Sequence, residues 1–143
     1  MGNLPQGATE TGVFTAPSGS SLPSVPKKAA GVEGKVFFPI SFTLPTATAP
    51  EFVAVKGAED KSAQGCDGLV SGVPTADEGK LCVYYAPGAP ALFVASATLG
   101  IRNPATNSAA PGATSRSGAI LEVLCASEVS DCLAHGVWAV TGN

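Results

Sequence analysis

The chain has 143 residues, the length of a single domain, and we expect residues 1–143 to fold around one hydrophobic core. Charged residues make up only 13% of it, and 17 glycines and 12 prolines leave few good helix formers. Because its eight basic residues are dispersed and the formal net charge is −3, the chain has no positive stripe for phosphates, which excludes nucleic acid as an expected partner.

Seven short apolar segments are typical of β-strands, because they are rich in β-branched and aromatic residues and are separated by proline, glycine and serine. In chain order they are TGVFTA (11–16), KVFFPISFTL (35–44), EFVAVK (51–56), KLCVYYA (80–86), ALFVASATLGI (91–101), GAILEVLCA (118–126) and GVWAVTG (136–142). Their spacing predicts an all-β domain, an antiparallel β-sandwich of about eight strands in jelly-roll or Greek-key order. A head like that of C1q or tumour necrosis factor is among the forms of this fold that we expect.

Three of these segments carry further local information. Residues 51–56 alternate, which places Phe52 on one face of the strand and Val53 on the other. Pro39 lacks a backbone N–H and predicts an edge strand or a bulge. Residues 118–126 contain helix formers, but the segment is short and its surroundings are β-rich, so a strand is expected.

The first and last segments share the pattern Gly-Val-aromatic, which ends in Phe14 near the beginning of the chain and in Trp138 near its end. Trp138 is the only tryptophan, and an aromatic side chain of this size is expected to be tied into a core. We therefore expect the first and last strands to be neighbours in one sheet, with Phe14 and Trp138 on the same inward face. The alternative is a chance similarity between two amphipathic strands.

The four cysteines, Cys66, Cys82, Cys125 and Cys132, favour two disulfides. No pair has the C-x-x-C spacing of a zinc site, and a structural zinc would need all four thiolates from two distant segments. We expect neighbours to pair, Cys66 with Cys82 and Cys125 with Cys132, because each pair brackets a turn-rich stretch. The first bond would close a loop worth about 3 kcal/mol. The alternative is four buried thiols in a reducing cytosol.

Catalysis is poorly supported by the residues present. His135 is the only histidine, no G-x-S-x-G turn precedes it, and a reactive Cys132 beside it would conflict with the expected disulfide. The acidic pairs at 59–60 and 77–78 lie in expected loops, where solvation explains them, and neither has the ligand spacing of a calcium site. We expect no enzyme, no metal and no cofactor.

The chain also resembles a known family over most of its length, from Glu10 to Thr141. The opening GATETGVF, the middle KVFFPISFTLP, the block from GCDG to EGKLCVYY and the closing GVWAVTG are similar to the C-terminal globular domain of secreted, collagen-like proteins of actinobacteria, where it follows Gly-X-Y repeats. This chain departs from the family pattern in having Cys125 and Cys132 and in lacking Gly-X-Y repeats, so it is expected to be a fragment from the C-terminal side of a stalk. The matching positions are Glu10 to Phe14, Pro39, Ile40, Cys66, Gly68, Pro74, Gly79 to Tyr84, and Trp138 to Thr141.

The resemblance implies a non-catalytic assembly module, the trimerising head of an extracellular surface fibre, because a collagen-like stalk needs three chains in register. Residues 83–101 contain no charge, and the expected contact between copies is made by Tyr84, Tyr85, Leu92 and Phe93. The alternative is that these side chains fill the core of the single chain. A second functional reading is an adhesin head that binds a carbohydrate or host receptor, although the connections 17–34 and 102–117 contain no aromatic residue.

Overall fold

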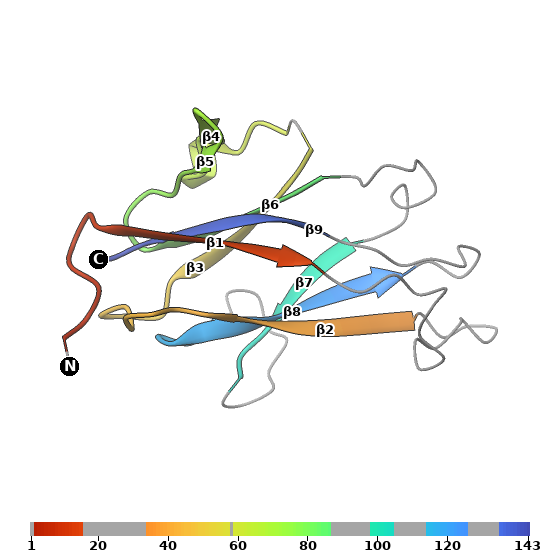
Figure 1. Cartoon of the computed structure of the whole chain (residues 1–143), viewed down its shortest axis with the longest axis horizontal. Coiled ribbons are helices and arrows are strands. Elements are labelled where there is room, and N and C mark those ends of the chain that lie inside the picture. Colours follow the sequence, from red (N-terminus) through yellow and green to blue (C-terminus); the bar gives the residue numbers. More distant parts are fainter. Residues whose placement is uncertain (1, 16–33, 58, 87–97, 105–113, 126–134) are drawn as a thin grey trace.

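A computed structural model describes residues 2–15, 34–57, 59–86, 98–104, 114–125 and 135–143. Within these ranges the chain is mostly strand, and the only helical element is one turn of 3₁₀ helix, η1 (Ser62–Gln64). The strands are β1 (Thr9–Thr15), β2 (Gly34–Ser41), β3 (Glu51–Lys56), β4 (Leu69–Val70), β5 (Val73–Pro74), β6 (Lys80–Ala86), β7 (Thr98–Arg102), β8 (Gly118–Cys125) and β9 (His135–Thr141) (Figure 1). The predicted β-rich fold is confirmed, including the strand at 118–125.

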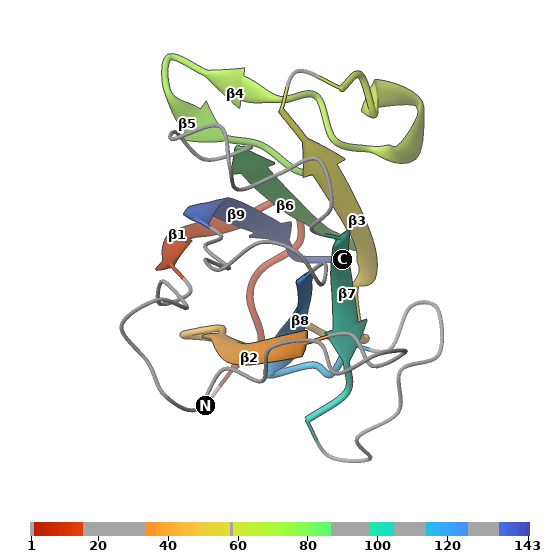
Figure 2. The ribbon, with the colours of Figure 1, turned by 90° about the vertical axis from the view of Figure 1, so that its right-hand side faces the viewer.

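The strands form two larger sheets and one small hairpin. One sheet has the order β1-β9-β6-β3, the other has the order β2-β8-β7, and β4 pairs with β5. In Figure 2, β1, β9 and β6 lie above β2 and β8, so that the two larger sheets form two layers, and β3 lies beside β7 at one edge. The first and last strands are neighbours, as expected, and Pro39 lies in β2, which is an edge strand.

One strand pair corrects the expectation of a purely antiparallel fold. β3 and β6 run parallel, with Val53 opposite Cys82 and Val55 opposite Tyr84. Two parallel strands need a long connection to return the chain to the same end of the sheet. The segment between Lys56 and Lys80 is long enough for such a connection, so the chain can pair β6 with β3 in either direction. Hydrophobic alternation is the same for a parallel and an antiparallel pair, and the sequence therefore does not predict the direction.

The pairing of β1 with β9 explains the shared Gly-Val-aromatic pattern. In this register Gly12 lies opposite Trp138 and Phe14 lies opposite Gly136. A Cβ atom on Gly12 would lie 2.5 Å from the Trp138 indole, and one on Gly136 would lie 3.0 Å from the Phe14 ring. Each aromatic side chain therefore covers the glycine of the partner strand. Both rings are buried and belong to the same core cluster.

The main core lies between the two larger sheets and draws on both. Phe14, Leu81, Val83, Trp138 and Val140 come from the four-stranded sheet, and Ile40, Ile101, Ala119 and Leu121 come from the three-stranded sheet. The Phe42 ring, just after β2, packs on Trp138 with 5.8 Å between ring centroids and 48° between ring planes. Because successive side chains of a strand point to opposite faces, β6 also serves a second, smaller cluster. That cluster lies on the outer face of the four-stranded sheet and contains Val53, Val55, Cys66, Cys82 and Tyr84.

A carboxylate in β1 connects the four-stranded sheet to the chain that leaves the other sheet. Glu10 accepts hydrogen bonds from the backbone N–H groups of Thr43 and Leu44, each at 2.9 Å. Both donors lie shortly after the end of β2 and belong to none of the strands of the described chain. Glu10 thus acts as a tie between the two layers.

Candidate functional site

The outer face of the four-stranded sheet is covered in part by the segment between β3 and β6. A disulfide joins Cys66 of this segment to Cys82 of β6, with 5.8 Å between the Cα atoms. Both cysteines are buried in the outer cluster. The predicted bond between Cys66 and Cys82 is confirmed. Cys132 and the side chain of Cys125 lie outside the described residues, so the second expected pair stays a prediction.

Tyr84 of β6 is hydrogen-bonded to the same segment. Its hydroxyl donates a hydrogen bond to the backbone oxygen of Thr75 at 2.6 Å and accepts one from the backbone N–H of Gly68 at 3.1 Å. Its side chain is only 6% exposed. The expectation that Tyr84 contacts another copy of the chain is thereby corrected, because this side chain fills the protomer's own outer cluster.

The other three residues of the expected contact have different outcomes. Tyr85 follows Tyr84 in β6 and therefore points to the opposite face, where it is partly buried against the main core. Burial, and secondly the negative charge of Glu59, raise the pKa of the Tyr85 hydroxyl above its ordinary value. Leu92 and Phe93 lie outside the described residues.

A small hairpin, β4 and β5, projects from the segment that the disulfide holds. Its two central residues, Ser71 and Gly72, have φ values of 51° and 79°, as a two-residue type I′ turn requires. These two strands were not predicted, although the Ser-Gly pair between Val70 and Val73 is a turn signal in the sequence. The hairpin carries Leu69, Val70 and Val73 at the surface.

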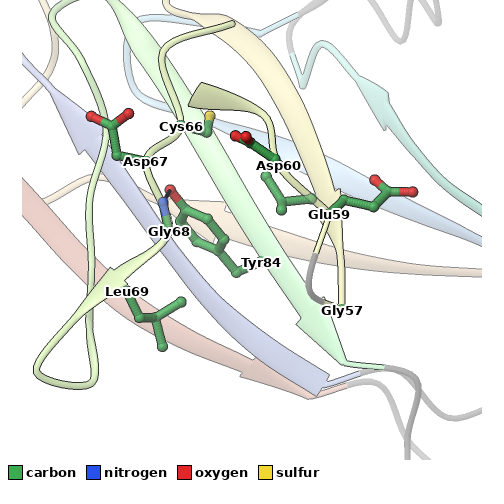
Figure 3. A pocket seen from close by; sticks show the side chains of 9 residues that line it. Gly57, Glu59, Asp60, Cys66, Asp67, Gly68, Leu69 and Tyr84 are labelled. Carbon is green, nitrogen blue, oxygen red and sulfur yellow. Dashed lines mark hydrogen bonds between the residues drawn. The ribbon is translucent and has the colours of Figure 1, made fainter. Parts of the chain in front are cut away.

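A pocket of about 340 Å³ opens between this segment and the end of β3. It is lined by Val55, Gly57, Glu59, Asp60, Cys66, Asp67, Gly68, Leu69 and Tyr84. Figure 3 shows the Tyr84 ring in the middle of these residues, with Leu69 and Glu59 on opposite sides of it in that view. The pocket therefore has an apolar and aromatic floor, whereas its polar lining is acidic. This pocket was not predicted from the sequence, where solvation alone explained the acidic pair at 59–60.

The three carboxylates of the pocket differ in their partners. Asp60 accepts hydrogen bonds from the hydroxyl of Ser62 at 2.6 Å and from its backbone N–H at 3.0 Å, and these bonds lower the pKa of Asp60 below its ordinary value. Glu59 accepts a bond from the backbone N–H of Lys56 at 3.3 Å and lies 3.9 Å from the Lys61 ammonium. Within the described part of the chain, the Asp67 carboxylate has neither a hydrogen bond nor an ion pair. Among the described residues, no basic side chain lines the pocket.

Four apolar side chains remain strongly exposed, one on β1 and three on the β4–β5 hairpin. They are Val13 at 81%, Val70 at 62%, Val73 at 53% and Leu69 at 49%, and we call them the apolar flank. Val13 also ends an apolar row across the outer face of the sheet, the outer row, because Val55 is paired with Tyr84, Tyr84 with Val137, and Val137 with Val13. The row is buried at Val55 and Tyr84, half-buried at Val137 and open at Val13.

No family model, curated protein or solved structure matches the chain. The similarity to collagen-like heads therefore stays a prediction from the sequence motifs. The described residues include no helix with the length and apolarity needed to cross a membrane. They also include no group of three or more histidine, cysteine or acidic side chains arranged to hold a metal ion. His135 is the exposed first residue of β9.

Proposed function

We propose that the chain is a non-catalytic, self-associating head domain of a secreted collagen-like surface fibre, and that it assembles as a trimer. In this proposal the two facing sheets are a β-sandwich head of the jelly-roll or Greek-key kind. The observation that carries the proposal is the outer row, which its own chain covers at one end and leaves open at the other. The trimeric state and the stalk come from the sequence resemblance, since three collagen-like chains must be brought into register.

The exposed end of the outer row has the properties of an association surface. β1 is an edge strand, and exposed edges of soluble proteins are ordinarily protected by charged residues, proline or bulges. The one charged residue of β1 is Glu10, and its carboxylate is directed to Thr43 and Leu44. Val13 is therefore exposed on β1 among polar and small residues. A second copy of the chain that covered Val13 would complete the burial of the outer row.

The disulfide supports placement of this head outside the cell. Structural disulfides persist in oxidising compartments and are rare in the cytosol. The Cys66–Cys82 bond connects a buried position of β6 with the segment that covers it, so it has a structural place in the fold. An extracellular or cell-surface location is accordingly part of the proposal.

Sedimentation equilibrium of the purified chain tests the proposal. We expect a species of about three times the monomer mass of 14.1 kDa at micromolar concentration. The triple variant Val13→Thr, Val70→Thr, Val73→Thr keeps β-branched side chains but removes apolar surface, and we expect it to be monomeric with unchanged strand content by circular dichroism. Gln64→Glu, an exposed change in η1 of the same segment, is the control and should leave the trimer intact. A wild-type chain that stays monomeric would refute self-association.

A second candidate function, recognition of a ligand at the surface, is favoured by the acidic pocket. The pocket has both an aromatic floor and polar groups, which is the combination that binding sites use. This reading is compatible with a fibre head if assembly uses Val13, Val70 and Val73 of the apolar flank, since only its fourth member, Leu69, also lines the pocket.

A further inference from the structure

We propose that the β4–β5 hairpin of one copy packs on the outer side of β1 in the next copy, so that Val70 and Val73 cover Val13. The contact is heterologous, because each copy gives its hairpin to one neighbour and its β1 to another. The inference rests on the self-association proposed above and names the two surfaces that produce it.

The hairpin has one side directed to its own chain and one side directed to solvent. Leu69 and Pro74 are paired across it, and of these Pro74 is buried and Leu69 lines the pocket. Val70 and Val73 form the next pair and point to the opposite side, because successive side chains of a strand alternate. In Figure 2 the hairpin lies beyond β6, on the side away from β2 and β8. It therefore presents two adjacent β-branched side chains to solvent.

Val13 provides the matching surface at the open end of the outer row. Its partner in β9 is Val137, whose partner in β6 is Tyr84, so all three lie on the outer face of the four-stranded sheet. At Tyr84 the row is covered by the segment that carries the hairpin, whose Gly68 and Thr75 are bonded to the tyrosine hydroxyl. A hairpin from a second copy, placed over Val13, continues this cover to the end of the row.

Neither surface carries a charge that would oppose the contact. Residues 68–75 include no charged side chain, and the carboxylate of Glu10 in β1 is bonded to Thr43 and Leu44. Exposed strands of single chains are ordinarily protected by charged side chains. Because such protection is absent from β1 and the hairpin, burial of their valines requires no desolvation of a charge. The partner expected for each surface is uncharged and apolar, and the same chain supplies it.

The difference between the two surfaces decides how the copies associate. If β1 packed on β1, or a hairpin on a hairpin, the contact would be isologous and would leave the other surface of both copies exposed. A contact between hairpin and β1 leaves one free surface of each kind on a pair of copies, so a third copy can join and close a ring. In a ring of three, Val13, Val70 and Val73 of every copy are covered. The heterologous contact is thus consistent with a trimer.

The hairpin is held in place before a second copy binds. The Cys66–Cys82 disulfide anchors the chain just before it. At its base, Thr75 donates two hydrogen bonds to the backbone oxygen of Gly68, one from its N–H at 3.1 Å and one from its hydroxyl at 2.7 Å. A surface that is fixed in advance loses little conformational entropy on association. The hairpin is therefore preorganised for docking.

Two lysine variants test the contact, since lysine on exposed strands guards natural proteins against association. Val13→Lys blocks β1 and keeps the hairpin, whereas Val70→Lys blocks the hairpin and keeps β1. At a concentration where sedimentation velocity shows the wild type as a trimer, we expect each variant alone to be monomeric. Their equimolar mixture should form a heterodimer that neither grows nor closes. Titration of fluorescently labelled Val13→Lys with Val70→Lys should give a dissociation constant below about 1 mM.

The controls separate this contact from self-association in general. Gln64→Lys adds the same charge at an exposed position of η1 and should assemble like the wild type. Circular dichroism checks that each variant keeps its strands, and Val13→Thr and Val70→Thr replace any variant that does not. If either single variant still assembles alone, or if the mixture binds no better than a variant carrying both lysines, the heterologous contact is wrong. A monomeric wild type, in contrast, refutes self-association itself.

Discussion

Gly12 and Gly136 decide where the two aromatic side chains of the terminal strands lie. The sequence pattern predicted that these strands are neighbours, but it did not predict their register. The register follows from the space each ring needs, because Trp138 lies over Gly12 and Phe14 lies over Gly136. A pattern of Gly-Val-aromatic on two antiparallel strands satisfies both rings at once. The same reasoning is available from the sequence for any pair of strands that carry it.

Gly12→Ala tests this account of the register. The new Cβ would lie 2.5 Å from the Trp138 indole, so the buried ring would have to leave its place over β1. We expect a loss of about 2–3 kcal/mol in the free energy of unfolding. Urea denaturation followed by Trp138 fluorescence measures it. Gly2→Ala, which adds a Cβ with nothing within 4 Å, is the control. Equal stability of the two variants would contradict the account.

Tyr84 and Tyr85 were predicted to contact another copy together, but they lie in different clusters of the fold. Their adjacency made them resemble one apolar cluster, whereas the two-residue period of a strand sends them to opposite faces of the sheet. Tyr84 joins the outer cluster and Tyr85 packs against the main core. The period was visible in the sequence. What was not visible is that the outer face would also be covered, since this depends on a segment that folds back over it.

At the scale of elements, the segment between β3 and β6 contains both features that the sequence predicts and features that it does not. Cys66 and Cys82 were paired correctly because they are close in sequence and bracket turn residues. The parallel direction of β3 and β6, the β4–β5 hairpin and the pocket were not predicted. Each depends on contacts between residues distant in the chain, which local spacing does not specify. The strand boundaries at 51–56 and 80–86, in contrast, match the sequence prediction residue for residue.

The disulfide is expected to stabilise this region strongly. Replacing both Cys66 and Cys82 by alanine should cost about 3 kcal/mol in unfolding free energy, because it releases a loop with a sequence separation of 16 residues. Urea denaturation with and without dithiothreitol measures the loss. Limited proteolysis should then cut within the segment between β3 and β6, which stays intact in the oxidised protein. If neither the unfolding free energy nor the proteolysis pattern changes, the disulfide does not have this stabilising role. A further loss on reduction of the double variant would reveal the expected second bond, between Cys125 and Cys132.

At the scale of the whole molecule, a polar contact connects the two layers in addition to their shared core. Glu10 supplies a polar connection of two charge-assisted hydrogen bonds, which are stronger than neutral ones. Its place in the resemblance motif gave no indication of this role, because the acceptors and donors are 33 and 34 residues apart.

Glu10→Gln should therefore destabilise the protein by about 2 kcal/mol, because one carboxylate oxygen is replaced by an amide NH₂ that faces a backbone donor. Glu51→Gln is the matched control. Glu51 pairs with Lys80 on the exposed surface, where such pairs contribute about 0–1 kcal/mol. Chemical denaturation of both variants gives the comparison. If Glu10→Gln costs no more than Glu51→Gln, the connection between the layers is carried by the core alone.

The position of β9 between β1 and β6 also constrains how the protein is made. β1 leaves the ribosome before every other described strand, yet its ladder partner is the last of them to emerge. Until residue 141 is free, β1 has no ladder partner in the finished sheet, and its edge is open to unwanted pairing with other nascent chains. The four-stranded sheet can therefore close only once β9 has emerged, and a holding factor that shields β1 until then would raise the yield of correctly assembled protein.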